Sequence, residues 1–314
     1  MTTRAKALAS LAGAMILVGS SVAAGRILTA ALPIHFASLA RFALASLVLA
    51  PLVIAREGRL PRLSRRSLAV VLGQALCGSF LFTVCLLAGL RLTGAAEAGV
   101  AAAATPAAVT LLGWLFFRER PCGRAVAGIL ATMAGIAVLT AAPARADAPS
   151  PFLGNALVLC AVAFEAVFLL LRRAVTEPLS PLGAAFWVSA AGTALFLVPG
   201  LCQAGSVDPG ALTPGVVAAV VHYALGVTVA AYVLWFYGVV RVDAATAGVV
   251  TGVMPVSALV FAALVCGESV GWREMAGCVA VLAGILGLAT AGPGRPARTA
   301  PARGATVRAD GRGS

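Results

Sequence analysis

Apolar residues follow one another along this chain in ten long runs, which short polar or basic stretches separate. The runs cover residues 7–27, 34–55, 67–90, 96–117, 124–142, 152–171, 181–201, 214–239, 244–266 and 272–291. A helix that crosses the hydrocarbon core of a bilayer needs about 20 mostly apolar residues, which is close to the length of each run. The pattern predicts an all-α integral membrane protein with ten transmembrane helices.

The composition agrees with this fold class and excludes others. Hydrophobic residues make up 61% of the chain and charged residues 11%, whereas about a quarter of the residues of a soluble domain are charged. The seven cysteines form no C-x-x-C pair and the two histidines show no H-E-x-x-H spacing, so neither pattern predicts a metal site. No G-x-S-x-G nucleophile motif occurs either. We therefore expect no catalytic residues, no metal and no cofactor, and the protein is not expected to be an enzyme.

The basic residues are unevenly distributed among the connections. Most of the 23 Lys and Arg residues fall near the amino terminus, in every second connection and in the last residues of the chain. The remaining connections hold Arg26, Arg91, Arg145 and Arg273. Because positive residues gather in cytoplasmic loops, this distribution predicts a multi-pass protein of the cell membrane with both termini in the cytoplasm. The lipid bilayer then accounts for the formal net charge of +12, and no nucleic-acid partner is expected.

Identical residues recur 149 positions apart, which indicates an internal duplication. The pairs are Gly99 and Gly248, Pro106 and Pro255, Glu119 and Glu268, Gly128 and Gly277, and Gly135 and Gly284. They predict a first repeat at 1–142, a linker at 143–151, a second repeat at 152–291, and a basic, disordered cytoplasmic tail at 292–314. Each repeat holds five runs, and since five is odd, the second repeat enters the membrane in the opposite orientation. Inverted repeats are typical of secondary transporters.

Residues 90–140 and 239–290 resemble the EamA repeat of the drug/metabolite transporter superfamily. Each has an Ala-rich helix with a proline inside it, a hairpin with Glu, and a Gly-rich helix that ends in apolar residues. The segments Gly19-Ser20-Ser21 and Arg41-Phe42 are also similar to that repeat. The resemblance implies ten helices around a central cavity, alternating access, and movement of small metabolites without ATP.

Two charged residues inside apolar runs are candidates for the translocation site. Glu165 lies in the run 152–171, where an ionised carboxylate is costly, so it is expected either to face a cavity as a proton or cation site or to make a structural contact helped by Arg172. Arg41 lies in the run 34–55. Its guanidinium suits a substrate carboxylate or phosphate, and the alternative is a structural arginine bonded to carbonyls at a helix end.

The run 214–239 supplies three more candidates. His222 is placed either to relay a proton or to donate a hydrogen bond across a helix interface. Tyr232 and Trp235 are three residues apart and share a helix face, from which they could contact a substrate or a cation. The alternative is the aromatic belt at the membrane interface.

The repeated prolines and glutamates have structural interpretations as well. Pro106 and Pro255 each remove a backbone donor inside a predicted helix, so they are candidates for helix breaks or hinges. Glu119 and Glu268 lie at hairpins, where capping or salt bridges are more expected than catalysis. The glycines at 248, 252, 277 and 284 are expected to allow close packing of helices.

Together these features predict a secondary transporter that exports small organic metabolites or amino-acid-like compounds, with proton coupling through Glu165 as a hypothesis. No Walker A motif occurs and Lys6 is the only lysine, so ATP does not drive it directly. The expected partners are a small-molecule substrate, the bilayer and a second copy in a homodimer. The alternatives are a nucleotide-sugar or phosphate-ester exchanger, a membrane-embedded enzyme and a scaffold that transports nothing.

Overall fold

The computed structural model describes residues 2–117, 121–140, 150–175, 179–242 and 244–290, and this part of the chain is helical and contains no strand. Glu119, most of the predicted linker and the predicted tail lie outside it. The α-helices are α1 (Thr3–Ala31), α2 (Ile34–Glu57), α3 (Arg65–Gln74), α4 (Phe82–Leu92), α5 (Ala95–Ala102), α6 (Thr105–Phe117), α7 (Gly123–Thr140), α8 (Pro151–Leu171), α9 (Pro181–Ala204), α10 (Pro214–Val221), α11 (Ala231–Val239), α12 (Ala244–Val250), α13 (Val253–Cys266) and α14 (Trp272–Ala289).

Two longer helices contain a π-helical segment. Segment η1 (Ala75–Leu81) joins α3 to α4, and segment η4 (His222–Ala230) joins α10 to α11. Two short 3₁₀ turns, η2 (Arg172–Ala174) and η3 (Pro209–Ala211), lie between helices. Because a bilayer offers no water to the backbone, helices that satisfy their own N–H and C=O groups are the expected solution for such apolar segments.

The described residues hold eight helical segments that are long and apolar enough to cross a membrane. The pair α5–α6, bent by 40° at its break, makes a ninth if it counts as one span. Helix α7 is apolar but shorter, with its apolar part at Gly123–Leu139. Each of the ten predicted runs thus corresponds to helix, and the prediction is confirmed at the level of a multi-pass, all-α membrane protein.

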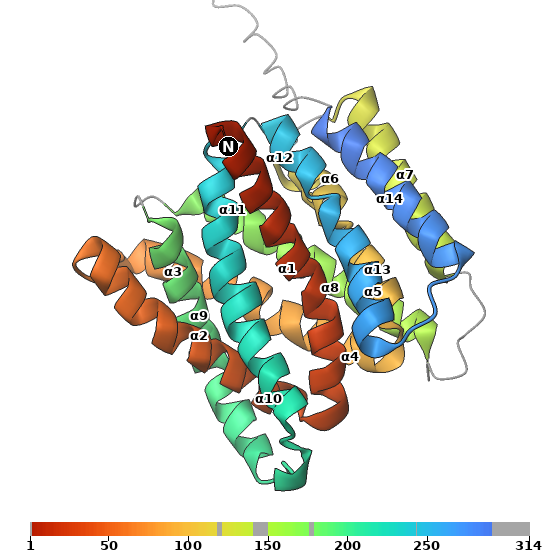
Figure 1. Ribbon diagram of the computed structural model, residues 1–314. Coiled ribbons are helices and arrows are strands. Elements are labelled where there is room, and N and C mark those ends of the chain that lie inside the picture. The colour runs from red at the N-terminus through yellow and green to blue at the C-terminus, as the bar shows by residue number, and fades with distance from the viewer. Residues whose placement is uncertain (1, 118–120, 141–149, 176–178, 243, 291–314) are drawn as a thin grey trace, which may run out of the picture.

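Helices from the two halves of the chain pack against each other in pairs. Figure 1 shows α7 beside α14 at one edge of the bundle and α2 near α9 at the other, and both pairs are in extensive contact. Between them α1 packs on α13 and α11, while α8 packs on α6 and α4. The amino end of α1 and the carboxyl end of α14 lie at the same end of the bundle (Figure 1).

Glycines set the distance between α7 and α14. A Cβ atom on Gly128 would lie 2.8 Å from the carbonyl oxygen of Gly284, and one on Gly135 would lie 2.8 Å from that of Gly277. Because the earlier glycine of α7 faces the later glycine of α14, the two helices run antiparallel. Close backbone contact of this kind is how helices associate in membranes, where the lipid is as apolar as the side chains.

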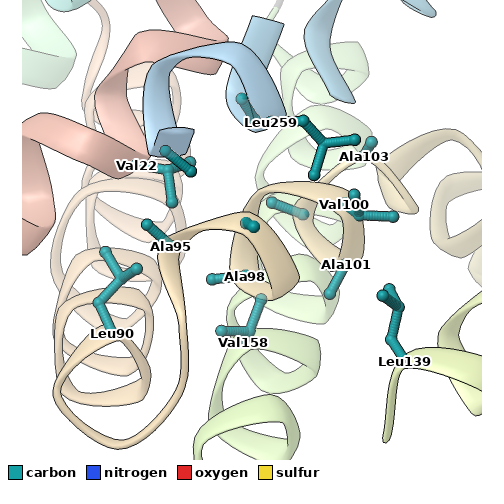
Figure 2. Close-up of a cluster of buried hydrophobic side chains, with 14 of the residues drawn as sticks. Val22, Leu90, Ala95, Ala98, Val100, Ala101, Ala103, Leu139, Val158 and Leu259 are labelled. Carbon is teal, nitrogen blue, oxygen red and sulfur yellow. The ribbon is translucent and has the colours of Figure 1, made fainter. Parts of the chain in front are cut away.

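Helix α5 lies at the centre of the largest hydrophobic cluster. All of its residues are buried, and most of them are alanines. Figure 2 shows Ala95, Ala98 and Ala101 among side chains from α1, α4, α8 and α13. Small residues let five helices approach here, so the first half of the broken span is held firmly by the rest of the bundle.

Candidate functional site

Arg41 on α2 is held by groups from the π-helical segment η4. Its Nε donates to Oγ1 of Thr228 over 3.1 Å, and the guanidinium carbon lies 4.0 Å from the ring centroid of Tyr223 and 4.5 Å from that of Phe42. Its Nη1 is buried and has no hydrogen-bond partner in the described part of the chain. A buried donor without a partner is costly, and a guanidinium pairs most favourably with an acceptor such as a carboxylate.

The π-helical geometry of η4 explains how its side chains reach Arg41. Thr228 Oγ1 donates to the carbonyl oxygen of Tyr223, five residues earlier, over 3.1 Å. A wider turn brings these two residues to one face, and π-helical segments are frequent at functional sites. The two π-helical segments occupy corresponding positions in the two repeats, because adding the repeat spacing of 149 residues to the positions of η1 gives positions within η4. The apolar pattern alone did not indicate either segment.

Glu165 on α8 is paired with a hydroxyl group. Its Oε2 lies 2.5 Å from Oγ1 of Thr105, the first residue of α6. This bond is a structural polar contact, which was the alternative to a proton or cation site. Arg172 does not take part in it, because its Nη2 donates to the carbonyl oxygen of Leu179 over 3.4 Å. No ion pair of Glu165 occurs among the residues the structure describes.

Tyr232 on α11 interacts electrostatically with both charged groups. It is within electrostatic range of Glu165, Arg41 and Arg172. Arg41, Glu165 and Tyr232 are surrounded by protein, yet each keeps part of its surface accessible. The structure thus brings together three residues that the sequence predicted separately.

His222 and Trp235 lie outside this group. His222 Nε2 is 2.7 Å from Oγ of Ser20 on α1, and that hydroxyl already donates to the carbonyl oxygen of Leu17 over 2.7 Å. The imidazole is therefore the donor, which matches the alternative of a hydrogen bond across a helix interface. Trp235 is half-buried and makes no hydrogen bond to the group within the described chain.

Pro106 and Pro255 follow breaks rather than interrupting continuous helices. Pro106 is the second residue of α6, after the break that bends the span by 40°. Pro255 is the third residue of α13, after a break of two residues that leaves the span straighter. A proline fits the first turn of a helix, where its missing N–H is not needed. Both prolines therefore start a new helix segment inside the membrane.

Glu268 joins the two halves of the chain. From the hairpin before α14 its carboxylate accepts the backbone N–H groups of Ala95 and Ala96 at 2.7 and 3.0 Å. It thus caps α5, where a negative charge also meets the positive end of the helix dipole. This agrees with the expectation of a capping role. Glu119, its counterpart in the repeat, is not among the described residues.

One buried carboxylate was not predicted from the sequence. Glu97 is 7% exposed, and its Oε2 accepts a hydrogen bond from Thr93 Oγ1 over 2.7 Å. Asn155 of α8 lies beside both, with its Oδ1 3.0 Å from Thr93 Oγ1. Glu97 comes three residues after Gly94, the N-cap of α5, a position at which Glu supports a helix start. That spacing was the signal that could have found it.

An apolar groove of about 340 Å³ lies away from these polar groups. Its lining consists of Val249, Gly252, Val253, Val256, Leu282, Ile285 and Leu286. Val256 and Leu286 are 45% and 48% exposed, so the groove opens to the lipid side. It offers no polar group to a substrate. In the described part of the chain, no three His, Cys, Asp or Glu side chains come together to hold a metal ion.

The apolar spans define a multi-pass membrane protein, and comparison with known proteins places it more narrowly. Residues 5–141 and 152–290 each match the EamA-like transporter family. The chain belongs to this family and is a membrane transporter. It is 34% identical over 278 residues to the "Uncharacterized transporter YetK" of Bacillus subtilis (strain 168), which covers 88% of this chain and 84% of that protein. The family and this relative point to a transporter rather than to an enzyme.

A solved structure shares the fold. A protein crystal structure with 22% sequence identity matches this chain with a TM-score of 0.62, over 91% of this chain and 97% of that one. At this identity the likeness concerns the arrangement of helices alone.

Proposed function

We propose that this transporter is an exporter of small organic compounds that works by alternating access across the cell membrane. The observation that carries the proposal is the group of Arg41, Glu165 and Tyr232. It places a cation and a carboxyl group within electrostatic range of one tyrosine, deep among membrane-spanning helices. Ionisable residues at such depth are expensive and are typical of substrate and ion pathways.

Three features support ten spans arranged as two inverted repeats. Helix α7, the counterpart of α14 at a spacing of 149 residues, packs against it in antiparallel orientation. The contact of α1 with α13 has its counterpart in that of α8 with α6. The π-helical segments also correspond. In such transporters the two halves exchange conformations around a site near the middle of the membrane.

The orientation in the membrane follows from the ends and the loops. Both ends of the described chain lie at one end of the bundle (Figure 1). The connections at that end carry most of the arginines, so the proposal places it in the cytoplasm.

The substrate class is set by the chemistry of the group. The guanidinium of Arg41 suits a carboxylate, and the Glu165 carboxyl suits an ammonium group or a proton, so amino-acid-like compounds fit both. A phosphate ester calls for several cations, whereas Arg41 is the one whose Nη1 is buried without a partner in the described chain. The group therefore favours compounds with a single carboxylate.

Comparative metabolite profiling of medium and cytosol tests the proposal. Cells would produce the wild type, Arg41→Gln, Glu165→Gln or an equally abundant unrelated membrane protein. Arg241→Gln is the matched control, because Arg241 is an exposed arginine bonded to the carbonyl oxygen of Tyr237. We expect at least one carboxylated compound to be enriched outside with the wild type and the control, and not with Arg41→Gln. Equal profiles for all the strains would contradict an exporter.

A further inference from the structure

The break between α5 and α6 leaves the Ala102 carbonyl group without its helical donor. In a continuous helix the N–H of residue 106 would bond to the carbonyl oxygen of Ala102, but Pro106 has no N–H. The hydroxyl of Thr105 takes its place, with Oγ1 3.0 Å from that oxygen. Inside a membrane an unsatisfied carbonyl is costly, so this hydroxyl stabilises the break.

The same hydroxyl also contacts Glu165, and it has one hydrogen to give. Oγ1 of Thr105 is 3.0 Å from the Ala102 oxygen and 2.5 Å from Oε2 of Glu165. When Glu165 is protonated, its O–H donates to Thr105 and Thr105 donates to Ala102, so every group is satisfied. When Glu165 is ionised, the hydroxyl turns to the carboxylate, and the Ala102 carbonyl loses its partner.

The corresponding break in the second half has no such arrangement. There the missing donor is that of Pro255, and the carbonyl oxygen of Thr251 accepts from the backbone N–H of Met254 over 3.0 Å. Met254 occupies the position that corresponds to Thr105 and has no hydroxyl. Protonation of a side chain can therefore change the hydrogen bonding at the break between α5 and α6, but not at the break between α12 and α13.

The titratable groups near Glu165 come from several elements. Tyr232 on α11 faces Glu165 within electrostatic range. The ionisable side chains described on elements packed against α8 are Arg65 and Arg66 on α3, Cys77 in η1, Cys85 and Arg91 on α4, Glu97 on α5, Arg124 on α7 and Arg172 in η2. None of them is hydrogen-bonded to Glu165 in the described chain.

We propose that Thr105 is a positioning residue that couples the proton on Glu165 to the helix break between α5 and α6. Loss of the proton to water or to a basic substrate group removes the partner of the Ala102 carbonyl and loosens the break. Binding of a proton restores it. The inference rests on the proposed function in one respect, namely that Glu165 faces the translocation route. It names the part of the fold that senses proton binding.

Hydrogen–deuterium exchange of the purified protein across a pH series tests the coupling without any substrate. The segment compared is 98–110, after correction for the intrinsic pH dependence of exchange. In the wild type we expect local opening to increase roughly ten- to hundredfold as Glu165 ionises, the range for a buried group left unpaired. Glu165→Gln is expected to stay protected at every pH. Thr105→Val is expected to stay open at every pH, and Thr105→Ser is expected to match the wild type.

Two controls are available in the same chain. Thr110→Val removes a hydroxyl one turn further along α6, where it donates to the carbonyl oxygen of Pro106 over 2.9 Å, and it is expected to keep the wild-type pH dependence. The segment 247–259 around the second break is expected to show none.

Wild-type pH dependence in Thr105→Val, or a remaining titration in Glu165→Gln, would overturn the coupling. If Thr105→Val does not fold, the other two variants test the coupling. Exchange of the segment must then depend on pH in Thr105→Ser and must not depend on pH in Glu165→Gln; any other result contradicts the coupling. Because exchange needs no substrate, its failure leaves the export result untouched. An absence of export would likewise leave a positive exchange result in place.

Discussion

The contact between α7 and α14 makes a quantitative prediction for the substitution Gly284→Ala. The added Cβ would lie 2.1 Å from Oγ1 of Thr132, 2.7 Å from the carbonyl oxygen of Gly128 and 3.0 Å from the backbone nitrogen of Thr132. The Thr132 hydroxyl can rotate away only by giving up its bond to the Gly128 carbonyl oxygen. The two backbone atoms cannot move unless the helices separate.

Two opposing contributions determine the size of the effect. Alanine is a better helix former than glycine by about 0.5–1 kcal/mol. Inserting a methyl group into a closed contact costs about 1–3 kcal/mol, and the lost hydroxyl bond adds about 1 kcal/mol. The steric cost is larger, so we expect Gly284→Ala to destabilise the protein by roughly 1–3 kcal/mol.

Gly73→Ala is the matched control, because its Cβ would meet only Leu171 Cδ1, at 3.7 Å. Here the helix-forming contribution acts alone, so we expect the thermal unfolding midpoint in one detergent to stay level or rise. For Gly284→Ala the midpoint should fall. If both variants unfold at the same temperature, the close packing of α7 and α14 inferred from their glycines is wrong.

Three other substitutions separate structure from transport. Arg41→Lys keeps the charge but loses the bond to Thr228, so export of the carboxylated compound should fall about tenfold; an unchanged export rate would remove Arg41 from the site. Glu268→Gln removes the charge that caps α5 and should cost about 1–2 kcal/mol of stability by thermal unfolding, and an unchanged midpoint would contradict the cap. His222→Ala should lose about 1 kcal/mol with its bond to Ser20 and keep export. A stable variant without export would instead give His222 a role in transport.

The helices could be predicted from the sequence because the bilayer leaves one periodic solution for long apolar segments. The predicted run 214–239 and the observed segment Pro214–Val239 agree closely. Pro106 and Pro255 indicated the two breaks, but the residues around them are as apolar as the rest of each run, so hydropathy did not show where each helix ends and the next begins. The π-helical segments were missed for a similar reason, since a wider turn changes which residues face each other without changing hydropathy.

The residues of the candidate site could be predicted from the sequence, but the contacts between them could not. Glu165 and Arg41 were identified because they lie inside apolar runs, where burying a charged side chain is costly and is typical of functional sites. That Tyr232 lies near both depends on how separate helices pack, which no local pattern encodes. Thr105 was overlooked because a threonine in an apolar run is common, and its position directly before Pro106 becomes meaningful only once the break is seen.

The two halves of the chain share their packing but not their charges, and this difference has a physical cause. Helix α9, which corresponds to α2, has no basic residue, and α1, which corresponds to α8, has no acidic one. Glycine contacts and π-helical segments can be repeated because each half must pack in the same way. A second buried arginine and carboxyl group would double the cost of desolvation without adding to the binding of one small substrate at one site. On the proposed function, the repeated features therefore belong to the scaffold, and recognition of the substrate depends on residues that occur once.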